Sequence, residues 1–444
     1  MRSLVPRGGL WRHRDFLKLW SAETVSQFGT QVSQLALPFI AITILDASAF
    51  AVAALGTVEF LPFLLFTLPA GVWVDRLPRR LILIVSDYGR AALLFSVPLA
   101  YAFDALTLAQ LFAVGFLVGT LTVFFDVSYQ AYLPSLVQRD QIIEGNSKLE
   151  VSRTVSQITG PGVAGGLIGL ITAPYAVLVD AISFVASGAF LSAIRKQEQR
   201  PAPTAGGDKP RMRSELREGL QYVVRHPLLR PQALCTGTSN FFSNVTFSIF
   251  LVYAVRTLGL SAGEIGLIFT LGGPGGLLGA LLSQRITRRF GVGRTTIAMM
   301  LLSGGAGFLI PLAPQSFPYP FLVASGLIFG FTVVVYNITQ VSLRQAITPE
   351  RIQGRMNSVM RFLVWGTIPL GSLTGGALAS TIGLRETLFV GAVGGLLSGL
   401  PIILSRAQRT LGQIPEPEPE LAPVEAAAAG GIAAVSPAPV QPDA

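Results

Sequence analysis

The sequence predicts an all-α membrane protein, with twelve transmembrane helices in two parallel six-helix repeats and both termini in the cytoplasm. About twelve apolar runs each approach the roughly 20 residues that cross a bilayer as a helix. Of the 33 Lys and Arg residues, 31 fall in alternate gaps between the runs, and the other gaps hold only Arg256 and Arg385. Because cytoplasmic loops retain Lys and Arg, this alternation predicts the topology. Arg90, just inside the third run, is counted with the cytoplasmic gap before it.

The first repeat is expected over residues 1–194 as an N-terminal bundle. Its apolar runs predict helices over 17–43, 50–75, 81–103, 107–131, 147–172 and 174–194. The polar stretch 195–230 then forms a cytoplasmic linker with a Pro/Gly segment. Within it, 214–222 places Leu216 and Leu220 on one face, which predicts a short amphipathic helix on the inner membrane surface.

The second repeat is expected over residues 231–405. Its runs predict helices over 232–256, 264–287, 294–314, 317–343, 355–381 and 385–405. Residues 406–444, rich in Pro, Glu and Ala, bury too little apolar surface to fold, so we expect a disordered cytoplasmic tail.

Short motifs recur in the two halves at matching places. The matched pairs are Asn146-Ser147 with Asn357-Ser358, Gly160 and Gly165 with Gly371 and Gly376, Ser26-Gln27-Phe28 with Ser239-Asn240-Phe241, and Arg79-Arg80 with Arg288-Arg289. Two halves in the same orientation imply parallel repeats about an axis normal to the membrane.

Composition excludes several classes of protein. With 51% hydrophobic and 13% charged residues, the chain cannot cover the surface of a soluble protein of this size. The net charge of +9 is scattered over cytoplasmic loops, so we expect no nucleic-acid partner. Cys235 is the single cysteine, so no multi-cysteine metal site can form, and we expect neither a metal nor a cofactor. No phosphate-binding Gly-x-x-x-x-Gly-Lys-Ser/Thr loop occurs, so the chain is neither an ATP-driven pump nor, we expect, an enzyme.

Polar residues inside four of the runs fall on helical stripes. These are Glu23, Gln27, Gln31 and Gln34; Thr122, Asp126 and Gln130; Thr236, Asn240, Asn244 and Ser248; and Thr332, Tyr336, Thr339 and Gln340. Since polar groups that face lipid are costly, one helix in each three-helix unit is expected to line an aqueous cavity. The candidate substrate-binding residues are Gln27, Gln31, Gln34, Asn240, Phe241, Asn244, Tyr336, Gln340 and Trp365. The alternative is that the stripes hydrogen-bond between helices.

Four acids inside the N-terminal runs are candidates for proton coupling: Glu59, Glu23, Asp126 and Asp180. A carboxylate near the bilayer centre is expensive and needs a reason. With no histidine inside a run, proton coupling would have to use these groups. The alternative for Asp126 is a structural ion pair with Arg153 at the cytoplasmic end of the adjacent helix.

Two motifs are candidates for gating. The turn after the second run carries Gly71, Asp75, Arg76, Arg79 and Arg80, whose ion pairs could hold one arrangement of the helices and release another. The fifth run contains Gly160, Pro161 and Gly165, where small residues permit close packing and proline permits bending.

These motifs resemble those of the major facilitator superfamily over residues 10–410. Gly71 to Arg80 resembles its loop signature, and Gly160-Pro161 with Gly165 resembles the fifth-helix motif of its drug–proton antiporters. The chain is most similar to the branch of macrolide-efflux and enterobactin-exporter-like proteins, as in Trp11 to Phe16 and Leu133 to Val137. The resemblance implies a cavity lined by the first, fourth, seventh and tenth helices. The fourth-helix Arg found in many such antiporters is absent, and Asp126 is the only charge in that run.

The sequence therefore predicts a multi-pass secondary transporter of a bacterial inner membrane. It would export amphipathic, drug-like or siderophore-like small molecules in exchange for protons, as a monomer in the lipid bilayer. Two alternatives stay open: a lipid or lysolipid flippase on the same fold, and a receptor or scaffold that does not transport. The polar stripes and buried acids argue against the scaffold, because they cost stability and would serve nothing there.

Overall fold

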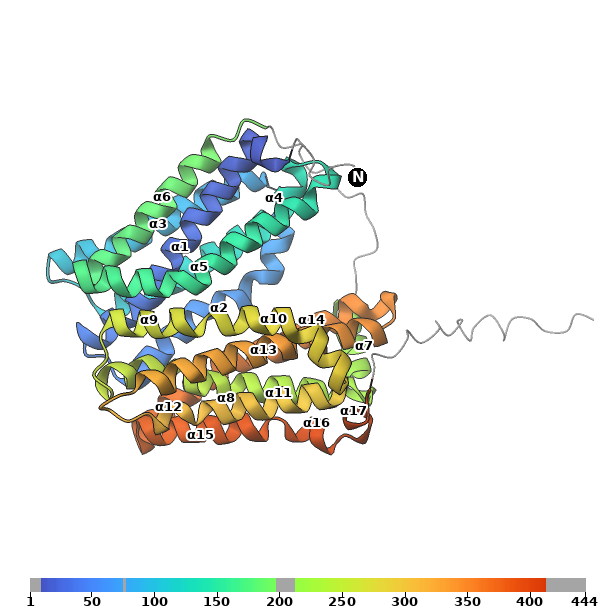
Figure 1. Cartoon of the computed structure of the whole chain (residues 1–444). Coiled ribbons are helices and arrows are strands. Elements are labelled where there is room, and N and C mark those ends of the chain that lie inside the picture. Colours follow the sequence, from blue (N-terminus) through green and yellow to red (C-terminus); the bar gives the residue numbers. More distant parts are fainter. Residues whose placement is uncertain (1–8, 75–76, 197–211, 413–444) are drawn as a thin grey trace, which may run out of the picture.

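The computed structural model describes residues 9–74, 77–196 and 212–412, which form helices joined by short connections (Figure 1). Within these residues, eleven helical segments are long and apolar enough to span a membrane. The first predicted span is a thirty-residue helix, α1 (Arg14–Thr43), in which the predicted row of Glu and Gln lowers the hydropathy. With α1, the predicted fold of twelve membrane helices is confirmed.

The N-terminal bundle consists of six long helices. They are α1, α2 (Ala49–Val74), α3 (Arg79–Ala102), α4 (Leu108–Leu136), α5 (Ile142–Ile171) and α6 (Ala173–Ser192). Two short 3-10 helices, η1 (Leu10–Arg12) and η2 (Arg139–Gln141), precede α1 and α5. α1 packs along α5 and α6, α4 packs along α2 and α3, and α3 packs on α6 to close the bundle. This pairing leaves α1 and α4 facing each other across the interior.

The C-terminal bundle repeats this arrangement with more breaks. Its helices are α8 (Leu229–Arg256), α9 (Ala262–Gly272), α10 (Pro274–Phe290), α11 (Val292–Gly307), α12 (Leu309–Leu312), α13 (Tyr319–Ile347), α14 (Glu350–Ile382), α15 (Leu384–Leu397), α16 (Leu400–Leu404) and α17 (Arg406–Arg409). Three spans are broken in two, at α9–α10, α11–α12 and α15–α16, where Gly and Pro interrupt the helical hydrogen bonds. α8 packs on α14 and α15, and α13 packs on α9, α10 and α11. α8 and α13 therefore take the places of α1 and α4.

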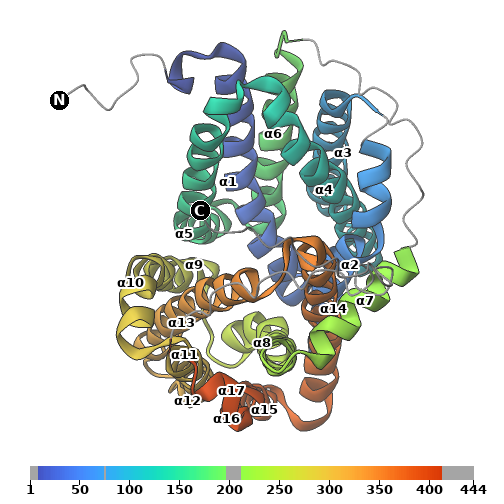
Figure 2. The same ribbon diagram turned by 90° about the vertical axis from the view of Figure 1, so that its right-hand side faces the viewer.

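The linker helix forms as α7 (Met212–Arg225) and includes the predicted segment 214–222. It lies beside α14 (Figure 2), at the same end of the molecule as α17 (Figure 1). Val223 is buried, and a Cβ on Gly219 would lie 2.9 Å from the carbonyl oxygen of Arg355. Glu218 forms an ion pair with the same arginine. One face of this helix therefore docks on α14, whereas Leu220 and Val224 stay exposed, and its contact with the membrane surface stays a prediction.

In the part of the chain that the structure describes, the helices of the two bundles lie close together at one end and apart at the other (Figure 1). The largest hydrophobic cluster contains residues of both bundles, among them Ala41 and Leu55 from one and Tyr253 and Ile265 from the other. At the opposite end, near α7 and α17, the buried clusters of the two bundles are separate. We call the touching end the closed end and the other, where η1 and α7 lie, the open end. The described helices therefore diverge toward the open end.

Candidate functional site

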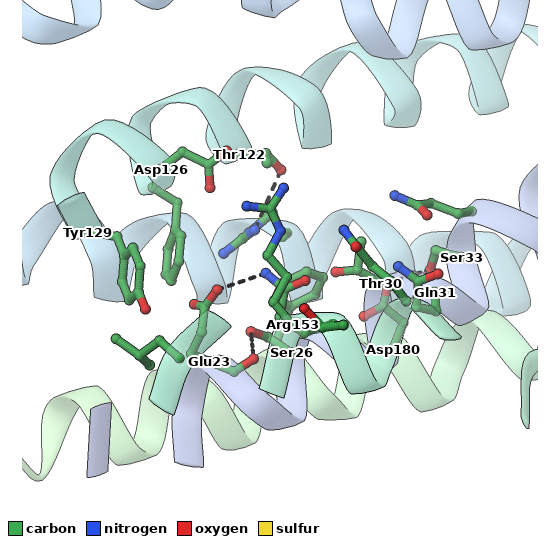
Figure 3. A pocket seen from close by; sticks show the side chains of 18 of the residues that line it. Glu23, Ser26, Thr30, Gln31, Ser33, Thr122, Asp126, Tyr129, Arg153 and Asp180 are labelled. Atoms are coloured by element: carbon green, nitrogen blue, oxygen red, sulfur yellow. Dashed lines mark hydrogen bonds between the residues drawn. The ribbon is translucent and has the colours of Figure 1, made fainter. Parts of the chain in front are cut away.

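A cavity of 1190 Å³ lies inside the N-terminal bundle, between α1 and α4 (Figure 3). Residues of all six helices line it, and Leu277 of α10 is its one described lining residue from the other bundle. The cavity extends from Gln34 and Asp180 to Asn146 and Glu150. Asn146 and Glu150 belong to the first part of α5, so this end of the cavity lies toward the open end. Its charged lining residues are Glu23, Glu59, Asp126, Glu150 and Asp180, with Arg90 and Arg153. Five acids against two arginines leave an excess of three negative charges when all are ionised.

The predicted polar stripe of α1 faces this cavity. Gln27, Gln31 and Gln34 all line it, as the helical spacing indicated. Glu23 heads the stripe and is 8% exposed. Its Oε1 accepts a hydrogen bond from Gln27 Nε2 at 2.7 Å, whereas its Oε2 is buried without a hydrogen-bond partner. One oxygen of this carboxyl is thus held while the other is available to a proton.

Glu59 lies in the middle of α2, against α4. A Cβ on Gly115 would lie 2.9 Å from Glu59 Cγ, so the glycine in α4 provides the space for this side chain. Glu59 Oε1 is buried without a hydrogen-bond partner. Among the described residues no cation forms an ion pair with Glu59, and a carboxylate whose oxygen is buried without a partner is costly as an anion, which makes Glu59 suited to bind a proton.

Asp180 is the most enclosed of the four predicted acids, at 1% exposure. It accepts hydrogen bonds from Ser33 of α1 and from Ser183, one turn along α6, the latter at 3.0 Å. Gly29 gives α6 the room for this approach, because a Cβ there would collide with Asp180 and Ser183. Hydroxyl groups rather than cations therefore hold this carboxyl.

Asp126 projects from α4 into the cavity, opposite Glu23 (Figure 3). In the described residues it makes no ion pair within 4.0 Å. Arg153, which also lines the cavity, lies 3.9 Å from Glu150 in an exposed contact. The ion pair between Asp126 and Arg153 that the sequence left open as an alternative is therefore not formed in this conformation.

The structure adds a buried ion pair in α3, Asp87 with Arg90. Asp87 is 0% exposed, and its Oδ1 lies 2.5 Å from Arg90 Nη2. The guanidinium lies between two rings, 4.1 Å from the centroid of Phe184 and 4.4 Å from that of Phe125. It also reaches Thr122 Oγ1 at 3.5 Å. The signal in the sequence is the Asp-x-x-Arg spacing, which places the two side chains one helical turn apart.

The charge count grouped Arg90 with the cytoplasmic loop before α3, but the structure places it inside the bundle. It is 4% exposed and lines the cavity that holds Glu23, Asp126 and Asp180. The fourth helix has no arginine, and the buried cation of this bundle's interior comes from α3 instead.

The candidate cavity residues of the C-terminal bundle lie outside this lining. Tyr336 and Gln340 are 3% and 4% exposed, and the Tyr336 hydroxyl lies 2.6 Å from Thr236 Oγ1. In α13, then, Tyr336 bonds to a neighbouring helix, whereas Gln340 bonds to Asn337 of its own helix. The remaining candidates face α14 or α2: Asn240, Phe241 and Asn244 pack on α14, and Trp365 of α14 makes an edge contact with Phe60 of α2 at 6.0 Å.

The gating candidates separate into two groups. Asp75 and Arg76 lie outside the described residues. Gly71 precedes them near the end of α2, and Arg79 and Arg80 follow at the start of α3, where they donate to carbonyl oxygens of Ala131 and Leu191. Both arginines thus bond within their own bundle.

The glycines of α5 lie at close contacts. Gly160 accommodates Gln31 of α1, and a Cβ on Gly165 would collide with the carbonyl oxygen of Ala262 in α9. The carbonyl of Pro161 meets Gly266 of α9 in the same way. The contacts of Gly165 and Pro161 with α9 join the two bundles toward the closed end.

Comparisons with known proteins agree over nearly the whole chain. The profile of a family described as transmembrane secretion effector matches residues 9–426. The multidrug efflux pump Tap of Mycolicibacterium fortuitum is 28% identical over 411 residues, which cover 88% of this chain and 95% of that protein. Tap of Mycobacterium tuberculosis (strain ATCC 25618 / H37Rv) is 26% identical, covering 89% and 94%.

Solved structures show the same fold. A bacterial homologue of the iron transporter ferroportin in its inward-facing state matches with a TM-score of 0.73 and 17% identity, covering 89% of this chain and 99% of that one. The nucleoside transporter NupG matches with a TM-score of 0.71 and 12% identity, covering 88% and 100%. A ferroportin homologue in an outward-facing state reaches a TM-score of 0.55, at 18% identity and 88% and 99% coverage.

Proposed function

The chain belongs to the transmembrane secretion effectors of the major facilitator superfamily and is a multi-pass membrane transporter, and we propose that it exports amphipathic small molecules in exchange for protons. The observation that carries the proposal is the cavity with its excess of carboxylates. Four of these acids, Glu23, Glu59, Asp126 and Asp180, lie within the membrane-spanning helices, where loss of water makes the anion costly, so a proton or a cationic group lowers that cost. A passive scaffold would gain nothing from that expense.

The conformation supports alternating access. The cavity extends toward the open end, whereas the α5–α9 contact and the shared hydrophobic cluster seal the closed end. Under the topology that the charge alternation predicts, the open end faces the cytoplasm, as an exporter loading its substrate requires. We propose that Gly71, Asp75, Arg76, Arg79 and Arg80 stabilise the alternative state, in which the bundles meet at this end.

The substrate class rests on the size and lining of the cavity. Its volume of 1190 Å³ exceeds that of typical drug-sized pockets, and amides and carboxylates alternate in it with apolar side chains such as Leu94, Val118 and Phe63. Such a lining suits bulky molecules with both polar and apolar faces. Relatives described as multidrug efflux pumps are consistent with this class.

The decisive experiment separates coupling from binding. In proteoliposomes, a proton gradient should drive uphill transport of a drug from a susceptibility panel, and an uncoupler should abolish it. Glu59→Gln should end uphill transport while sparing downhill exchange, because glutamine keeps the size and hydrogen bonding of glutamate but cannot titrate. Glu23→Gln should do the same if its free oxygen carries the proton.

A matched control is Glu150→Gln, since Glu150 lines the cavity near the open end and its side chain is 68% exposed. We expect this variant to keep uphill transport. Transport that persists without any proton or sodium gradient would contradict the antiport proposal. Transport of lipid head groups in place of drugs would favour a flippase.

A further inference from the structure

A second cavity, of 400 Å³, lies inside the C-terminal bundle. Its lining comes from α8, α9, α10, α11, α12, α13 and α15, so it lies between α8 and α13. Because the bundles are repeats, α8 and α13 stand where α1 and α4 stand around the first cavity. The fold thus builds an equivalent hollow in each half.

The chemistry of the two cavities is opposite. No described residue that lines the second one carries a charge. Five phenylalanines contribute to its wall: Phe242, Phe247, Phe250, Phe269 and Phe329. Nine glycines also line it, and at some of these positions two backbones come close, as where a Cβ on Gly330 would lie 3.1 Å from the nitrogen of Gly276. Missing side chains create the space, and aromatic rings make it apolar.

The two cavities adjoin each other at α10. Gly273 lines the second cavity, and a Cβ there would lie 3.1 Å from the side chain of Ile158, which lines the first. One turn further along α10, Leu277 lines the first cavity. Gly276 and Leu277 are successive residues of α10, so the apolar cavity and the acidic cavity lie along adjacent faces of this helix.

We propose that the second cavity binds an uncharged aromatic or alkyl group of the molecule whose polar part occupies the first cavity. This inference deepens the proposed function and rests on it for the identity of that molecule as the transported one. A volume of 400 Å³ lies in the range of about 300–1,000 Å³ that small-molecule pockets occupy, and a lining of phenylalanine and glycine offers an ionic group no partner. The contact at Ile158 places the apolar site beside the first cavity, which favours a part of the same molecule over a lipid chain.

The test uses the full chain in lipid nanodiscs with Cys235→Ser and Ser243→Cys, so that its single thiol lines the second cavity. N-phenylmaleimide labels this thiol, and N-alkylpyridinium ions of two, six and ten carbons compete. The cationic head suits the acidic cavity, and each buried methylene group should strengthen protection by about fourfold.

Gly395→Leu should fill the second cavity, because a Cβ at Gly395 meets only the Cα of Gly304, at 3.8 Å. We expect this variant to lose the gain in protection between six and ten carbons. Gly305→Leu is the matched control, since a Cβ there meets nothing within 4 Å and Gly305 does not line the cavity. It should keep the chain-length dependence.

Equal protection in the two leucine variants would overturn the inference. So would labelling that is slow in nanodiscs and fast in detergent, which would place a lipid chain in the cavity. The proposed function fails separately: a protein that transports no pyridinium ion but retains the dependence on chain length keeps the apolar site and loses the transport proposal.

Discussion

Adding one methyl group at Gly165 should shift the equilibrium between the two conformations of the transporter. In the structure, a Cβ at this position would collide with the carbonyl oxygen of Ala262 and lie 3.1 Å from the Cα of Gly263. All of these atoms belong to the backbone of α9, so no side chain can rotate away. The substitution Gly165→Ala therefore destabilises only the arrangement in which α5 and α9 touch.

The magnitude follows from overpacking, which costs about 1–3 kcal/mol when a packed contact cannot relax. Because the bundles must separate here when the closed end opens, the cost falls on one state alone. An energy difference of this size changes the ratio of the two states by about 5- to 150-fold. Any gain from replacing glycine by alanine in a helix applies to both states and cancels.

The assay is the rate at which an impermeant thiol reagent, added on the closed-end side, labels Gln34→Cys in a cysteine-free background. Gln34 lines the first cavity, so labelling from that side reports opening of the closed end. The rate should rise by about 5- to 150-fold in Gly165→Ala. Gly166→Ala is the control, since a Cβ there meets nothing within 4 Å, and it should leave the rate unchanged. Identical rates in both alanine variants would refute the packing argument.

Three further predictions concern charge. Asp87→Asn should lower the thermal unfolding midpoint in detergent by the equivalent of about 3–5 kcal/mol, because it leaves Arg90 buried without its carboxylate, and adding Arg90→Gln should restore much of the loss. Asp46→Asn, which breaks the 2.6 Å ion pair with Arg256, should cost less than about 1 kcal/mol in the same scans, since the Asp46 side chain is 94% exposed; a loss as large as that of Asp87→Asn would contradict this ranking. Asp104→Cys should be labelled by an impermeant reagent from outside intact cells, and labelling only after lysis would reverse the predicted topology.

The membrane helices could be predicted from sequence because a bilayer permits few alternatives. Inside lipid every backbone polar group must be bonded within its own helix, so length and hydropathy suffice to find most spans. The polar stripe of α1 was equally informative, since Gln27, Gln31 and Gln34 do line the cavity. Its spacing placed four long polar side chains on one face, more than the neighbouring helices can satisfy.

The same reasoning did not carry over to α13. Two hydroxyl groups of its stripe find partners on neighbouring helices, Tyr336 with Thr236 and Thr339 with Thr287, and Thr332 bonds to carbonyl groups of its own helix. A hydroxyl that bonds a neighbour and one that faces water have the same spacing in the sequence. Arg90 shows the opposite error, because a charge at the edge of an apolar run was counted with the loop. Only the fold shows that Phe184, from a helix far along the chain, covers its guanidinium.

Under the proposed function, the division of chemistry between the two bundles gives protons a mechanical role. Closing the open end would remove water from a cavity with five carboxylates and two arginines. The transfer of an ionised carboxylate out of water costs several kcal/mol unless a counter-charge or a proton compensates. Closure over an empty, ionised cavity is therefore disfavoured, whereas closure over protonated acids or over a bound cationic group is not. No charged residue among those described lines the second cavity, so its closure carries no such penalty. Protons would therefore couple to transport through the N-terminal bundle, and the C-terminal bundle would select molecules by their apolar groups.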